Sequence, residues 1–123
     1  LDPLARVVAF EAICLLKSNQ LGDASRKIED AVQQAPRDSL VQGVYGFILG
    51  NLSANDRARV ALERAVDCDA GRSFQAPRLY FARYCQEVGQ SACAEKYWRE
   101  LLEIDPNSLP ALAALSRIAL ERG

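Results

Sequence analysis

The chain has 123 residues, of which half are hydrophobic and a quarter are charged, a composition typical of one folded domain. The net charge of −1 provides no overall basic field that would attract nucleic acid or anionic lipid. Histidine is absent, so no serine–histidine or cysteine–histidine catalytic set can form and the commonest metal ligand is missing. No apolar run approaches the roughly 18–20 residues of a membrane helix. We therefore expect no enzyme, no cofactor, no metal site, no nucleic-acid partner and no membrane insertion of this segment.

Methionine is absent even from position 1, which favours a processed protein or an excised domain. Arginine far outnumbers lysine and alanine is abundant, which favours a bacterial source. A cytoplasmic location is favoured, with the periplasm as the alternative.

Helices are expected throughout, because no segment has the β-branched alternation of a strand. The expected helices cover about 3–17, 24–34, 39–50, 57–68, 76–88, 92–104 and 110–122. The expected N-caps are Asp2, Asp23, Asp38 or Ser39, and Ser91. The longest irregular segment is 69–75.

The four cysteines contain no C-x-x-C pair, which argues against a zinc or thioredoxin-like site. We expect Cys14, Cys68, Cys85 and Cys93 to be half-buried thiols that pack as small hydrophobic groups. Cys85 and Cys93 flank a predicted helix–helix turn, which leaves a disulfide between them open.

One spacing occurs three times along the chain. Ala24, Ile28, Ala31 and Pro36 lie at offsets of 0, 4, 7 and 12. The same offsets recur 34 residues later, and again 36 residues after that, at Ala58, Leu62, Ala65, Ala70, Ala94, Trp98, Leu101 and Pro106. A period near 34 with small, large and again small or apolar residues predicts a helix–turn–helix repeat.

These residues resemble the tetratricopeptide repeat, with repeats at 5–38, 39–72 and 75–108. Helix 109–122 is then the first half of a fourth unit or a cap. The resemblance implies a single all-α domain over 1–123, a right-handed α–α superhelix of about seven helices. Glu11 falls where a large apolar residue is expected, so the first helix is shifted in register or this position is unburied.

In this family, the first helix of each pair lines a concave groove. The resemblance assigns to the groove the residues Phe10, Ile13, Leu16, Gly43, Phe47, Gly50, Asn51, Leu79, Tyr80 and Arg83. Its best-known groove clamps a C-terminal carboxylate with lysine, asparagine and arginine, and only Arg83 matches that set. The remaining groove is apolar and aromatic, which suits an amphipathic helix or an apolar segment. Gly43 and Gly50 either let a ligand backbone come close or admit the neighbouring helix.

Other prominent residues are expected to have structural roles. Trp98 is expected in the core. A solvated helix face is expected for the charged residues Arg57, Arg59, Glu63, Arg64, Asp67 and Asp69.

Helix 109–122 is apolar over more than one face, although the outer face of a terminal cap should be polar. We expect its outer face to pack on further repeats or on a second copy, which would make a homo-oligomer. The leading functional hypothesis is a non-catalytic scaffold that binds a protein, as a peptide or amphipathic helix, in its groove. The alternative is an architectural or self-associating segment of a longer protein of this family, for example in bacterial envelope, secretion, pilus or exopolysaccharide assembly.

Overall fold

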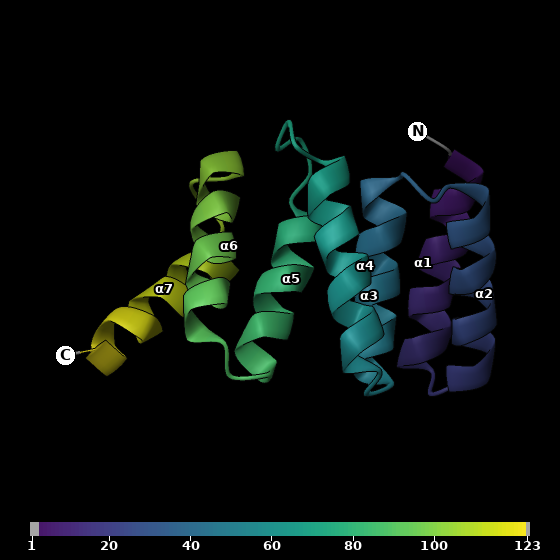
Figure 1. The fold of residues 1–123 in the computed structure, drawn as a ribbon, viewed down its shortest axis with the longest axis horizontal. Coiled ribbons are helices and arrows are strands. Elements are labelled where there is room, and N and C mark those ends of the chain that lie inside the picture. Colours follow the sequence, from purple (N-terminus) through teal and green to yellow (C-terminus); the bar gives the residue numbers. More distant parts are fainter. Residues whose placement is uncertain (1–2, 123) are drawn as a thin grey trace.

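The computed structural model describes residues 3–122, which form seven α-helices and no strand (Figure 1). The helices are α1 (Pro3–Lys17), α2 (Leu21–Gln34), α3 (Ser39–Asn51), α4 (Asn55–Cys68), α5 (Ala76–Glu87), α6 (Ser91–Ile104) and α7 (Leu109–Arg122). The prediction of an all-α fold is confirmed, while the expected cap Asp2 lies outside the described residues. None of the helices within 3–122 has the length and apolar character needed to cross a membrane.

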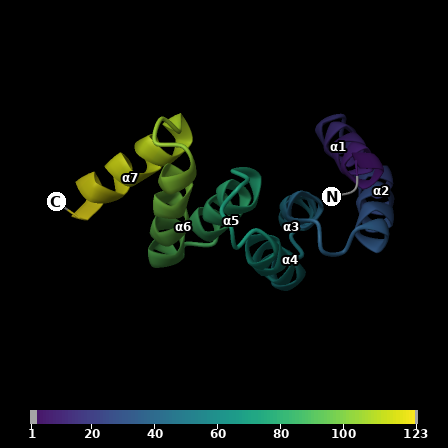
Figure 2. The same ribbon diagram turned by 90° about the horizontal axis from the view of Figure 1, so that it is seen from above.

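The helices pack in pairs that follow one another along a curved row (Figure 2). α1 pairs with α2, α3 with α4 and α5 with α6, while α3 also contacts both α1 and α5. The first helices of the three pairs are therefore neighbours, and α7 packs on α6. Because each pair covers the apolar face of the one before it, the row is a solenoid. We call the surface formed by α1, α3, α5 and α7 the concave face.

The turns within the three pairs share one backbone conformation. Asn19, Ser53 and Gly89 have left-handed φ angles of 62°, 61° and 80°. After each of them, the next backbone N–H donates to the carbonyl five residues earlier, at N···O distances of 2.8, 2.9 and 2.8 Å. A left-handed residue followed by this bond is the Schellman ending of a helix, for which glycine is the usual residue. The three copies of the sequence spacing therefore also share one turn conformation.

These turns correct three predicted helix starts. Neither Asp23 nor Ser91 caps its helix; the N-cap residues of α2 and α6 are Gln20 and Gln90, without a side-chain cap. α4 likewise begins at Asn55 rather than at 57. The reason is that the chain enters the next helix directly after the Schellman turn, so the Gln20 carbonyl already accepts from the Ala24 N–H at 3.0 Å.

Small residues set the distance between paired helices. Ala24, Ala58 and Ala94 of the repeated pattern are at most 1 % exposed. Gly46 of α3 allows an even closer approach, because a Cβ at this position would lie 2.5 Å from Cγ of Leu62. The large residues of the pattern fill the layer between helices: Ile28, Leu62 and Trp98 are at most 2 % exposed. The expected core role of Trp98 is confirmed.

The cysteines differ from the expectation of half-buried packing thiols. Cys85 is fully buried and is joined to Cys93 by a disulfide, with Cα atoms 5.9 Å apart. This bond links α5 to the first turn of α6. Cys14 and Cys68 are free and exposed, so the expectation is wrong for them, because their side chains lie outside the packed layers between the described helices.

Asp38 forms the junction between the first and second pairs. Its carboxylate caps α3 by accepting from the Leu40 and Val41 N–H groups at 3.0 and 3.4 Å. Arg6 of α1 donates to the same carboxylate through Nε at 2.9 Å and Nη2 at 3.2 Å. Burial by itself would raise the pKa of Asp38, but the hydrogen bonds from Arg6 and from the two backbone groups outweigh burial and lower this pKa.

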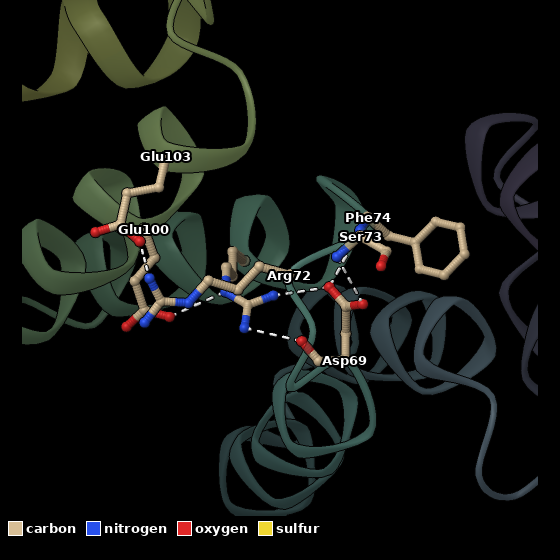
Figure 3. A network of polar contacts seen from close by, with 7 residues as sticks. Asp69, Arg72, Ser73, Phe74, Glu100 and Glu103 are labelled. Atoms are coloured by element: carbon tan, nitrogen blue, oxygen red, sulfur yellow. Dashed lines mark hydrogen bonds and ion pairs between the residues drawn. The ribbon is translucent and has the colours of Figure 1, made fainter.

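A buried charge network forms the junction between the second and third pairs (Figure 3). Arg78, 2 % exposed, donates to the Asp69 carboxylate at 2.8 Å, to the Asp69 carbonyl at 3.0 Å and to Glu100 at 2.9 Å. The Ser73 and Phe74 N–H groups donate to the same carboxylate at 3.0 and 3.1 Å. The prediction of a solvated Asp69 is therefore wrong, because the loop that follows it folds back over its carboxylate.

The two junctions meet at one edge of the solenoid. The Phe74 ring points away from Asp69 (Figure 3), and the Arg6 guanidinium lies 4.9 Å from the centre of that ring. Arg6 also forms an ion pair with Asp38. Residues of α1, of the start of α3 and of the loop before α5 are thereby connected.

Candidate functional site

An aromatic pair lies where α3 meets α5 on the concave face. The rings of Phe47 and Tyr80 stack with centroids 4.9 Å apart and an interplanar angle of 26°. Both side chains are half-buried, and burial raises the pKa of Tyr80 although the nearby Arg83 cation lowers it. The exposed parts of the two rings give this face an apolar contact surface.

The predicted groove glycines lie next to the aromatic residues of α5. A Cβ on Gly43 would be 3.5 Å from Cδ2 of Tyr80, and Gly43 is buried. A Cβ on Gly50, which is half-buried, would be 4.0 Å from Cδ1 of Tyr84. Of the two readings of Gly43, admission of the neighbouring helix is the one that fits its burial. Asn51 is exposed and its amide donates to the Phe47 carbonyl at 2.8 Å.

The predicted aliphatic groove residues are half-buried. Ile13 and Leu16 pack against the same core cluster as Phe47 and Tyr80. Leu79 packs against the C-terminal core cluster. These three side chains expose only part of their surface to a ligand.

The structure separates Phe10 from the rest of the predicted groove. Phe10 is 49 % exposed and lines a hollow of about 580 Å³ that only α1 and α2, with the turn between them, form. Val7, Cys14 and the Glu11–Lys27 ion pair (3.5 Å) belong to the same hollow, which leaves Glu11 unburied. The reason is that the equivalent residues of α3 and α5 pack against the preceding pair, whereas no pair precedes α1 among the described residues.

A single position of the repeat changes character along the concave face. Ile13 and Phe47 are 34 residues apart, Arg83 follows 36 residues later, and Arg117 lies another 34 residues on. We call these four residues the central row. The row is apolar on α1 and α3 and cationic on α5 and α7, so the two halves of the concave face favour different chemical groups.

A hollow of about 370 Å³ lies at the cationic end of the central row. It is formed by residues of α5, α6 and α7, namely Arg83, Gln86, Glu87, Trp98, Pro110, Ala113, Ala114 and Arg117. Arg83, Glu87 and Arg117 are exposed, whereas Trp98 is buried. This hollow extends the predicted groove beyond the third repeat.

Neither Arg117 nor Trp98 was predicted from the sequence to line this hollow. The signal for Arg117 was present, because it stands one repeat length after Arg83. It was overlooked because helix 109–122 was interpreted only through its apolar residues. No signal placed Trp98 at a surface hollow, since its repeat position belongs to the core.

The arrangement is suited to binding. It offers aromatic edges, aliphatic surface and guanidinium groups that donate hydrogen bonds. Within residues 3–122, no group of three or more cysteine, aspartate or glutamate side chains is placed to hold a metal ion.

No model of a known protein family matches the sequence. Cell division cycle protein 27 homolog A of Arabidopsis thaliana is 32 % identical over 83 residues, which are 68 % of this chain. The chain spans only 11 % of the length of that relative.

Among the solved structures that match nearly the whole chain are two that were seen with a peptide. The first TPR domain of Spaghetti (RPAP3), bound to an HSP90 peptide SRMEEVD, has a TM-score of 0.81 at 17 % identity and covers 95 % of this chain and 91 % of its own. The type III secretion chaperone SycD of Yersinia enterocolitica, in complex with a peptide of the translocator YopD, has a TM-score of 0.79 at 15 % identity. That match covers 100 % of this chain and 98 % of the SycD chain.

Proposed function

The chain has the fold of a tetratricopeptide repeat domain, and from this we propose that it is a non-catalytic scaffold that binds a peptide or amphipathic helix on its concave face. Two proteins with this fold, RPAP3 and SycD, are each seen with a peptide. The observation that carries the proposal here is the half-buried Phe47–Tyr80 stack, because aromatic edges supply a large contact area at little cost in side-chain entropy.

The proposal is tested with peptides selected from a random display library on the immobilised chain. Tyr80→Ala and Phe47→Ala remove one ring each, and we expect each to weaken the selected peptides by about tenfold or more, as truncation of an aromatic anchor does. Affinity is measured by isothermal titration. Far-ultraviolet circular dichroism checks that the helices remain.

The matched control is Val60→Ala, which truncates an exposed apolar side chain of α4 away from the concave face. This variant should bind with the affinity of the unchanged chain. Equal affinities for Val60→Ala, Phe47→Ala and Tyr80→Ala would refute the assignment of the groove.

A second candidate, a self-associating or architectural segment of a longer protein, is favoured by apolar side chains exposed at both ends of the row. Phe10 and Val7 are 49 % and 55 % exposed on α1, and Leu109 and Leu120 are 77 % and 81 % exposed on α7. Light scattering over a range of concentrations tests it. Concentration-dependent dimers that Leu120→Glu abolishes would support this candidate, and a strict monomer would remove the dimeric version.

A further inference from the structure

We propose that the hollow between α5 and α7 binds one acidic side chain of the segment held on the concave face. Arg83 and Arg117 would pair with its carboxylate, and the Trp98 indole N–H would donate to it. The inference rests on the proposed function and names the chemistry of the partner: an apolar or aromatic residue against Phe47 and Tyr80, and an aspartate or glutamate at the cationic end.

The two arginines of the hollow differ from most arginines of this chain in their ion pairing. Most arginines of this chain are in ion pairs, including Arg78 and Arg99, which lie close by on α5 and α6. Arg83 and Arg117 are different: among the described residues, neither has a carboxylate within 4.0 Å. Two guanidinium groups without an internal partner thus line one hollow, and guanidinium is the side chain best suited to a carboxylate.

Trp98, which is one of the residues that line the same hollow, has a buried indole N–H. Trp98 is 2 % exposed, and its Nε1–H has no acceptor within the described part of the chain. Buried donors are nearly always paired in folded proteins, and an indole can only donate. An acceptor brought by a ligand would satisfy it, whereas a cationic ligand would not.

The charge of Glu87 favours a ligand with a single carboxylate over groups with more negative charge. Glu87 stands on the same wall and, within the described residues, has no ion pair of its own. Its negative charge opposes a phosphate dianion or an acidic residue at a chain end, which carries two carboxylates. An internal aspartate or glutamate brings one charge, and the backbone N–H groups of its own segment can donate to Glu87.

The experiment uses the same library-selected peptides, synthesised with a fluorescein label and titrated with the chain by fluorescence anisotropy. The expected peptides carry an acidic residue at a fixed distance from an aromatic or aliphatic one. Replacing that acid by its amide should weaken binding about tenfold, the size of a charge-assisted hydrogen bond. Raising the salt concentration should weaken the acidic peptide more than the amide peptide.

The variants Arg83→Gln and Arg117→Gln should each weaken the acidic peptide several-fold to tenfold and leave the amide peptide unchanged. Arg64→Gln is the matched control, because Arg64 is exposed on α4 and also has no ion pair among residues 3–122. Trp98→Phe removes the donor and keeps most of the ring, and it should weaken the acidic peptide alone. The single tryptophan also gives an independent signal, a change in its emission on binding.

The outcomes separate the two proposals. The acidic site would be overturned if Phe47→Ala weakens the binding of the selected peptides but Arg83→Gln and Arg64→Gln change it equally. In that case the proposed scaffold function would still hold. Loss of binding on amidation of the peptide C-terminus, or a preference for phosphopeptides, would also overturn the acidic site. If Phe47→Ala and Tyr80→Ala leave affinity unchanged, the proposed function itself fails.

Discussion

The two junctions between helix pairs both place an aspartate against an arginine, but they bury that ion pair to different degrees. At the first junction, Asp38 caps the next helix and pairs with Arg6, whose side chain is 19 % exposed. At the second, Asp69 and Arg78 are both buried, and the carboxylate is surrounded by hydrogen-bond donors. The pair after the longer loop that follows α4 belongs to a buried network with Glu100, whereas the pair after the short turn that follows α2 is partly exposed and its carboxylate caps α3.

The largest expected effect is at the second junction. Arg78→Met leaves the Asp69 carboxylate buried with backbone donors alone, and breaking a buried pair in this way costs about 3–5 kcal/mol of unfolding free energy. Urea denaturation followed by circular dichroism measures the loss. Arg72→Gln is the control, because its ion pair with Glu103 is largely exposed and should be worth less than about 1 kcal/mol. Similar losses for both variants would contradict the assignment.

Asp38→Ala should cost less, about 2 kcal/mol, because it removes an N-cap and one partner of a partly exposed ion pair. The same denaturation experiment measures it. Ser108→Ala gives the comparison at the third junction, where the hydroxyl accepts from the Ala111 N–H at 3.4 Å and no arginine takes part. We expect about 1 kcal/mol or less for that variant. A larger loss for Ser108→Ala than for Asp38→Ala would show that Arg6 contributes nothing.

The pH dependence isolates the charge of Asp38 from its role as a cap. Asparagine also caps helices well, so Asp38→Asn removes mainly the charge, at an expected cost of about 1 kcal/mol near neutral pH. The pKa of Asp38 is lower in the folded chain than in the unfolded chain. Its stabilisation is therefore present above the ordinary aspartate pKa of about 3.9 and disappears as the pH falls through the lowered value. The stability difference between the two chains should shrink from pH 6 towards pH 3, and a constant difference would argue against the charge.

The smallest effect on stability is expected at the contact between Arg6 and Phe74, which connects the two junctions. Phe74→Leu keeps an apolar side chain but removes the aromatic face under Arg6, which should cost about 0.5–1 kcal/mol. Phe74→Tyr keeps the aromatic face and should be nearly neutral. Thermal unfolding of the two variants under one buffer condition makes this comparison. Equal melting temperatures would mean that the two junctions are energetically independent.

The sequence predicted the fold well because the fold depends on local periodicity. Ala24, Ala58 and Ala94 marked the positions where helices approach, and their burial follows directly from that spacing. Helix starts were predicted less well, because side-chain capping was expected where a Schellman turn decides the start. Gly89 is the usual residue of such a turn and Asn19 the next most common, whereas Ser53 gave no signal for the same conformation.

The candidate site was harder to predict, because it depends on which surfaces the neighbouring pair covers. Phe10 has the same repeat position as Tyr80, yet the first is exposed at the end of the row and the second stacks on Phe47. The burial of Asp69 depends on the loop that folds over it, and no periodic pattern describes that loop. Whether the source is bacterial stays a prediction.

The contact between Arg6 and Phe74 bears on how the chain unfolds. Repeat proteins are commonly treated as one-dimensional arrays, in which each unit is coupled only to its nearest neighbours and the ends fray independently. Here residue 6 touches residue 74, two repeats further along the sequence. Opening of the first helix therefore also removes a contact from the loop that introduces the third repeat. We expect hydrogen exchange to show the N-terminal helix and this loop opening together, as one cooperative unit that spans the array.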